Sequence, residues 1–109
     1  MTKAVYALSA DPIAFGHINV IERASKMFDT LYVAIGTNPN KKYFFDEKER
    51  FILAQESLKK YSNVKVFMFE GMLVDFAIKH GIKTIVRGIR NANDMDYEKT
   101  LHLTNKNLY

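Results

Sequence analysis

AVYALSADPIAFGHINVIERASKMFDTLYVAI, residues 4–35, contains two short apolar runs with a helical pattern between them. Residues 4–8 predict a strand, and residues 31–35 are apolar without alternation, which is typical of a parallel strand covered on both faces. From residue 18 to residue 28, apolar side chains recur at helical spacing with charged residues between them. The stretch therefore predicts a strand, a helix and a second strand in succession.

The same alternation continues through the rest of the chain. Asp46 and Glu49 have the spacing of a capping box ahead of a second helix, and Gly81 is the residue best suited to end a third helix in the left-handed conformation. Residues 64–68 alternate more clearly, which places that strand nearer a sheet edge. The further predicted elements are a helix carrying Phe51, Ile52, Ala54 and Leu58, a strand at 64–68, a helix at 72–80, a strand at 83–86 and a last helix from residue 93 toward residue 109.

Four strand and helix units without internal repeats predict a single α/β domain over residues 1–109. Its fold class is a Rossmann-like, doubly wound parallel sheet of about four strands, with helices on both faces and right-handed crossovers. In such sheets, ligands bind beyond the carboxyl ends of the strands, where the strand order reverses. The loops expected there are residues 9–17, 36–42, 69–72 and 87–93.

The composition of the chain excludes several classes of protein. The chain is 48% hydrophobic and 26% charged, which argues against disorder. It has no cysteine, which excludes disulfides and thiolate metal sites and suits a reducing compartment, so we expect a cytoplasmic protein. No apolar run is long enough to span a bilayer. The net charge of +4 favours anionic partners, but no stripe of basic and aromatic residues indicates nucleic acid.

Gly16 and His17 stand where the first helix is expected to begin. The amides of a helix N-terminus attract phosphate, glycine lets an anion approach the backbone, and histidine adds a directional donor. On this pair alone, a simple turn and helix cap is the favoured alternative.

Cations follow two other predicted strands. Lys41 and Lys42 come after the second strand, and Arg87 and Arg90 come directly after the fourth. Guanidinium binds phosphate through paired donors, whereas an ammonium acts as a point charge. Each pair alone also fits an ordinary solvated surface. Three predicted strands are each followed by a cation or by a helix start suited to phosphate. Together, these three strand ends predict that phosphate binds at one edge of the sheet.

Four segments together resemble the bacterial phosphopantetheine adenylyltransferases, which are nucleotidyltransferases with a Gly-His pair at a helix start. They are DPIAFGH (11–17), NPNKKYFFDEKER (38–50), GMLVDFA (71–77) and VRGIRNANDMDYE (86–98), and the resemblance extends over all 109 residues. It implies adenylyl transfer from ATP to 4′-phosphopantetheine, giving dephospho-coenzyme A and pyrophosphate, with Mg²⁺ arriving on ATP. It also implies a homo-oligomer, which is a hexamer in the family.

The resemblance also implies roles for individual residues. His17 is expected to steady the α-phosphate, Lys41 to engage the acceptor phosphate and the reacting centre, and Ser9 to touch phosphate at the end of the first strand. The acceptor phosphate is already ionised near neutral pH, so no side-chain base is required. The implied catalytic residues are His17, Lys41 and Arg90; the implied phosphopantetheine contacts are Ser9, Lys41, Met72, Leu73 and Arg87; the implied ATP contacts are Ser9, Gly16, His17, Arg87, Gly88, Arg90 and Glu98; and no protein ligand for a metal is expected.

Alternatives to these assignments remain open from the residues alone. Met72 and Leu73 fit core packing, and Glu98 fits a solvated helix face. Leu8 and Ala10 stand where the family usually has glycine and phenylalanine. The family also continues through another strand and a serine-rich loop, a C-terminal part that we expect this chain to lack. The alternative functions are therefore a nucleotide- or coenzyme A-binding module without catalysis, and a related nucleotidyltransferase with another phosphorylated acceptor.

Overall fold

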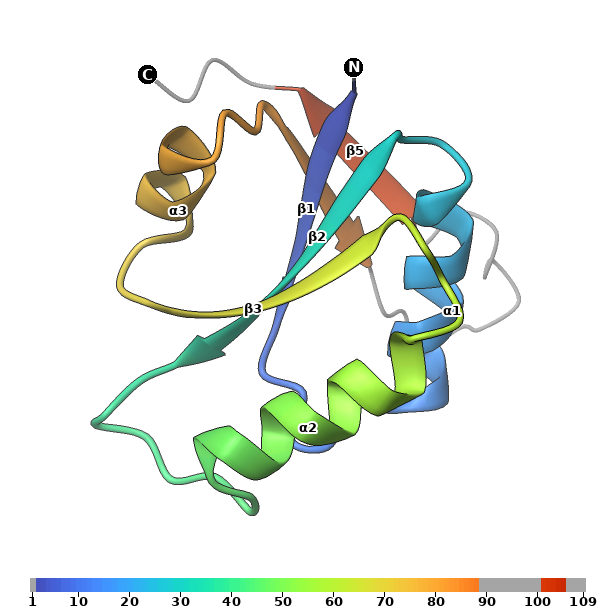
Figure 1. Ribbon diagram of the computed structural model, residues 1–109. Helices are drawn as coiled ribbons and strands as arrows, with labels where there is room; N and C mark the ends of the chain where they lie inside the picture. Colours follow the sequence, from blue (N-terminus) through green and yellow to red (C-terminus); the bar gives the residue numbers. More distant parts are fainter. Residues whose placement is uncertain (1, 89–100, 106–109) are drawn as a thin grey trace.

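The computed structural model describes residues 2–88 and 101–105 (Figure 1). Strands and helices alternate along the chain, as the sequence predicts. Within the described residues, no helix is long and apolar enough to cross a membrane. The elements are β1 (Lys3–Leu8), α1 (Phe15–Ser25), β2 (Thr30–Thr37), α2 (Glu47–Leu58), β3 (Val64–Glu70), α3 (Leu73–Lys79), β4 (Thr84–Gly88) and β5 (Leu101–Asn105).

The strands form one sheet in the order β3-β2-β1-β4-β5. Strand β1 pairs in parallel with both β2 and β4, and β2 pairs in parallel with β3. The predicted Rossmann-like class is confirmed, as are the interior place of β2 and the edge place of β3. The chain order reverses between β1 and β4, which puts the topological switch point at the carboxyl ends of these two strands.

The two faces of the sheet are covered by different helices, with α1 and α2 on one side and α3 on the other (Figure 1). Tyr6 and Val33 lie in a buried cluster with Ile21 of α1 and Leu58 of α2. On the opposite face, Val5 and Ala34 belong to a second buried cluster that contains Phe76 of α3. The alternation of side chains along each strand therefore places both faces in contact with helices.

The predicted last helix is wrong at its C-terminal end. Residues 101–105 form β5, which pairs antiparallel with β4 from Thr84 opposite Asn105 to Gly88 opposite Leu101. Without β5, the outer edge of β4 would present unpaired amide and carbonyl groups, and the antiparallel ladder satisfies them. Residues 93–100 and 106–109 of that predicted helix lie outside the described residues.

Helix α3 ends where the sequence predicts. Gly81 has φ of +68°, its amide donates to the carbonyl of Ile78 at 3.1 Å, and the Ile82 amide donates to the carbonyl of Ala77 at 2.8 Å. This pair of hydrogen bonds is a Schellman motif, which requires a residue in the left-handed region directly after the helix.

Replacing Gly81 tests this helix end. Gly81→Ala should lower the free energy of unfolding by about 1–2 kcal/mol, because a Cβ atom disfavours the left-handed conformation. Gly81→Asn is the matched variant and should lose less, since asparagine adopts this conformation more readily. Urea denaturation followed by circular dichroism measures both. Equal stability of the alanine variant and the parent chain would contradict this assignment.

Candidate functional site

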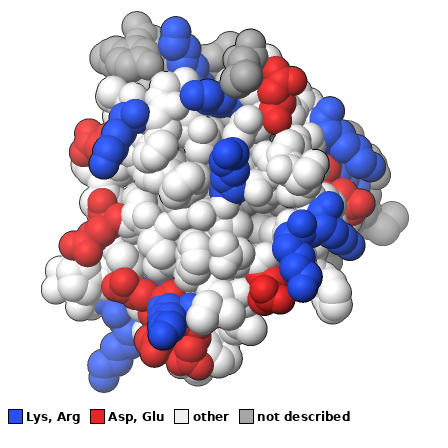
Figure 2. Space-filling view, in the orientation of Figure 1, with Lys and Arg blue, Asp and Glu red and all other residues white. Residues whose placement is uncertain are grey.

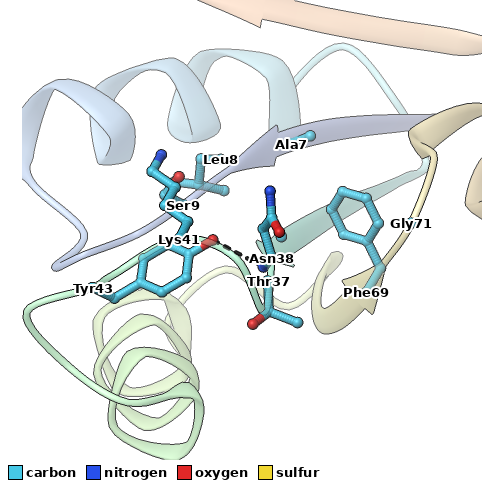
Figure 3. Close-up of a pocket in the computed structure, with 10 residues that line it drawn as sticks. Ala7, Leu8, Ser9, Thr37, Asn38, Lys41, Tyr43, Phe69 and Gly71 are labelled. Carbon is cyan, nitrogen blue, oxygen red and sulfur yellow. Dashed lines mark hydrogen bonds between the residues drawn. The ribbon is translucent and has the colours of Figure 1, made fainter.

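A cavity of about 360 Å³ opens at the carboxyl ends of β1, β2 and β3 (Figure 3). It lies at the edge of the sheet where the sequence predicts ligand binding, and three of the four predicted loops contribute to its walls. Its lining residues are Ala7, Leu8, Ser9, Gly36, Thr37, Asn38, Lys41, Tyr43, Phe69 and Gly71.

Two of the predicted site residues, Ser9 and Lys41, line this cavity together. Ser9 follows β1 directly, and Lys41 lies in the loop after β2, so the parallel pairing of these strands brings them to one opening (Figure 3). The loop is held by short contacts. The Asn38 amide donates to the Tyr43 hydroxyl oxygen at 3.0 Å, and the Lys41 amide donates to the Asn38 carbonyl at 3.0 Å. The Lys41 ammonium lies 5.6 Å from the centre of the Tyr43 ring.

His17 lies in the first turn of α1, outside the lining of this cavity. Its Nδ1 accepts a hydrogen bond from the Ala14 amide at 3.0 Å, so the imidazole caps the helix. This contact is the one expected if His17 is a helix cap. Because Nδ1 accepts, the neutral ring carries its proton on Nε2, which is the donor that a phosphate oxygen requires. The first turn of α1 contains no acidic side chain, so its amides keep their favourable field for an anion.

The other predicted site residues are distributed as follows. Gly16 lies beside His17 in α1. Met72, which is 66% exposed, follows the cavity residue Gly71, whereas Leu73 packs against the buried cluster around Phe76. Arg87 and Gly88 end β4, where the structure describes the backbone and not the side chains. Arg90 and Glu98 lie outside the described residues.

Arg50, to which no motif in the sequence pointed, is the one charged residue that is fully buried among those described. It lies in α2, and its guanidinium donates to the carbonyl oxygens of Ser9 and Gly36, each at 2.9 Å. Its central carbon lies 3.8 Å from the centre of the Tyr43 ring. The buried positions of α2 are Arg50, Ala54 and Leu58, and their four-residue spacing is the signal that could have found Arg50, whereas Ile52 of the same helix is 45% exposed.

Asp11 is a second residue to which its sequence motif gave no role. Its carboxylate oxygens accept hydrogen bonds from the amides of Phe44 at 2.7 Å and Phe45 at 2.8 Å. This contact joins the loop after β1 to the segment before α2. It therefore fixes the relative position of the two loops that carry Ser9 and Lys41.

Asp11→Ala should lower the free energy of unfolding by about 1–3 kcal/mol, because two amides lose a charged acceptor. Glu56→Ala is a control that removes an exposed ion pair to Lys59, 3.2 Å long, and it should cost about 0.5 kcal/mol or less. Urea denaturation compares the two variants. If they lose the same small amount, the Asp11 contact does not fix these loops.

The surface carries charges of both signs. On the face shown in Figure 2, lysine and arginine side chains are interspersed with aspartate and glutamate among largely uncharged atoms. The described part of this face therefore presents no continuous basic stripe of the kind that follows a nucleic-acid backbone. Among the described residues, no three histidine, cysteine or acidic side chains gather where they would hold a metal ion.

The parallel sheet, its switch point and the cavity at its carboxyl edge define a Rossmann-like α/β protein with a site among its strand-end loops. The sequence model of the cytidylyltransferase-like family matches residues 6–109. The chain belongs to this family.

Curated relatives agree with this assignment. Phosphopantetheine adenylyltransferase of Staphylococcus haemolyticus is 47% identical over 107 residues, which cover 98% of this chain and 66% of the relative. The enzyme of the same name from Dictyoglomus thermophilum is 43% identical over 109 residues, covering all of this chain and 66% of the relative. The predicted resemblance is therefore confirmed, and the chain spans about two thirds of the length of these relatives.

Two solved structures have the same fold at low sequence identity. A lipopolysaccharide core biosynthesis protein from Thermoplasma volcanium matches with a TM-score of 0.65 and 21% identity, covering 91% of this chain and 84% of that one. NadR protein, solved with NAD and AMP-PNP, matches with a TM-score of 0.61 and 19% identity, covering 73% of this chain and 27% of that one. At these identities the likeness supports the fold alone.

Proposed function

We propose that this protein transfers the adenylyl group of ATP to 4′-phosphopantetheine, as a step of coenzyme A synthesis. A phosphate oxygen of 4′-phosphopantetheine attacks the α-phosphorus of ATP and forms the new oxygen to phosphorus bond. The bond from the α-phosphorus to the oxygen bridging to the β-phosphate breaks, so dephospho-coenzyme A and pyrophosphate are the products. No proton needs to be removed, because the phosphate is already ionised near neutral pH.

The shared cavity of Ser9 and Lys41 is the observation that supports this proposal most strongly. A hydroxyl and an ammonium at the carboxyl edge of a parallel sheet suit a phosphorylated ligand. The names of the relatives, which match almost the whole chain, support the choice of substrates. In this reaction, catalysis needs mainly positioning and charge stabilisation, which cations and amides provide.

In the proposed site, each residue has a distinct task. His17 donates from Nε2 to the α-phosphate, Lys41 binds the acceptor phosphate and stabilises charge at the reacting centre, and Ser9 contacts phosphate. The remaining proposed contacts are Arg87, Met72 and Leu73 for the acceptor, and Gly16, Arg87, Gly88, Arg90 and Glu98 for ATP, with Arg90 also stabilising the reacting phosphate.

We further propose that Mg²⁺ reaches the site on ATP, held by phosphate oxygens and water, as is usual for this ion. The neutral hydroxyl of Ser9 in the cavity lining is compatible with such an ion. When bound, it would neutralise phosphate charge. Residues 1–109 would form one nucleotidyltransferase-like domain.

The proposal also includes the oligomeric state of the protein and its place in the cell. Phe15 and Phe44 are 90% and 92% exposed, and such apolar surface suits contacts between copies. We propose a homo-oligomer, hexameric as the resemblance implies, in the cytoplasm. ATP and 4′-phosphopantetheine are its partners, and neither nucleic acid nor a membrane is.

Pyrophosphate release tests the reaction. Incubation with ATP, 4′-phosphopantetheine and Mg²⁺ should give pyrophosphate and dephospho-coenzyme A in equal amounts, and omission of any component should abolish both. A panel of nucleoside triphosphates and phosphorylated acceptors identifies a related transferase. Binding of the substrates, measured by calorimetry, without pyrophosphate release would instead identify a binding module.

Two side-chain deletions test the assigned roles. His17→Ala should reduce kcat by about 10²–10³-fold, as loss of a transition-state donor does elsewhere. Lys41→Ala should reduce kcat/KM for the acceptor by a similar factor. Lys42→Ala is the matched control for Lys41, since the neighbouring exposed lysine does not line the cavity, and its rate should stay within about twofold of the parent. Normal turnover by the His17 variant would overturn its role.

A further inference from the structure

The burial of Arg50 is unusual for its chemistry. Its side chain is fully buried, yet among the described residues no carboxylate forms a salt bridge with it. Its two terminal nitrogens instead donate to the carbonyls of Ser9 and Gly36 and, at 3.3 Å, to the hydroxyl of Thr37, whereas its Nε has no hydrogen-bond partner among the described residues. Burial of a cation among neutral acceptors is costly unless several hydrogen bonds and an aromatic face offset the loss of water. An apolar residue in the place of Arg50 could not donate to these three acceptors.

The acceptors of Arg50 share one location. Ser9 and Gly36 lie at the carboxyl ends of the adjacent strands β1 and β2, and both line the cavity. One guanidinium nitrogen donates to both carbonyls, each at 2.9 Å. Arg50 therefore fixes the spacing of the two strand ends immediately behind the cavity.

A series of contacts extends from Arg50 to Lys41. The guanidinium stacks on the Tyr43 ring at 3.8 Å. The Tyr43 hydroxyl oxygen accepts from the Asn38 amide, and the Asn38 carbonyl accepts from the Lys41 amide. The backbone that carries Lys41 is thus held in three short steps by a side chain that does not itself line the cavity.

We propose that Arg50 is a positioning residue, which holds Ser9 and the Lys41 loop at the separation that the phosphorylated acceptor requires. The kinetic part of this inference rests on the proposed function, whereas the structural part does not. Lysine cannot replace Arg50, because an ammonium lacks the planar fork that reaches several acceptors and stacks on a ring.

Hydrogen exchange measured by NMR tests the structural part without any substrate. In Arg50→Lys, the amides of Asn38 and Lys41 should exchange at least about tenfold faster, while those of Val33 and Ala34 in β2 stay within about threefold. Lys48→Met, an exposed change of charge on the same helix, is the matched control and should leave all four unchanged. Equal acceleration of all amides, or acceleration of none, overturns the proposal.

Tyr43→Leu keeps the inference testable if Arg50→Lys does not fold. It removes the ring on which Arg50 stacks and the hydroxyl that accepts from Asn38, at a position that is only half-buried. The same selective acceleration at Asn38 and Lys41 is expected. Unchanged exchange at these two amides would show that no restraint passes from Arg50 through Tyr43.

A double-mutant cycle tests the kinetic part. Arg50→Lys should raise KM for 4′-phosphopantetheine at least about tenfold and KM for ATP less than about threefold, because the displaced lysine serves the acceptor. In a Lys41→Ala background, Arg50→Lys should change the acceptor KM less than about threefold, since its target is gone. An equal effect in both backgrounds, or an equal effect on both substrates, overturns positioning through Lys41. If the parent chain releases no pyrophosphate, the proposed function fails, and hydrogen exchange alone decides the role of Arg50.

Discussion

The parallel pairing of β1 with β2 on one side and β4 on the other is the constraint on which the rest of the structure depends. The carboxyl ends of parallel strands lie at the same edge of the sheet. The loops that follow these strands therefore meet there, although they are far apart in the sequence. The right-handed crossovers then determine which helix covers which face, with α1 and α2 on one side and α3 on the other. The cavity is a consequence of this arrangement, because its walls are the last residues of three strands and residues of the loops that follow them.

Much of this framework was predictable because its signals are local. The uninterrupted apolar run of β2 and the stop of α3 at Gly81 each depend on a few neighbouring residues. Asp46 likewise caps α2 by accepting from the Glu49 amide at 2.8 Å. The strand β5 was missed because its pairing with β4 is not local. Residues 101–105 satisfy the open edge of β4, whose paired residues lie from Gly88 opposite Leu101 to Thr84 opposite Asn105, and a pattern of propensities does not report the hydrogen-bond needs of a distant edge.

The residues of the candidate site likewise fall into those that the sequence predicts and those that it does not. Ser9 and Lys41 were predictable as strand-end residues, and the structure brings them together. Arg50 was not predictable, because arginine is ordinarily exposed. A charged residue also interrupts the apolar pattern by which the buried face of α2 would be recognised. The Asp11 carboxylate was equally hidden, since its partners lie more than thirty residues away. Both residues act by satisfying backbone groups of distant loops, and only tertiary structure shows which backbone groups need a partner.

The two departures from the family pattern have a common physical setting in β1 and its loop. Ala10 has φ of +51° and is 1% exposed, packed in a cluster with Ile35 and Ala54. A small side chain suits a buried position whose backbone lies in the left-handed region, where bulk adds to the strain. Leu8 packs against the sheet core and also lines the cavity, so it gives the opening an apolar wall where glycine would leave backbone exposed. The polar groups of the cavity are therefore concentrated on Ser9 and on the loop from Thr37 to Lys41, which is the part that the Arg50 contacts hold in place.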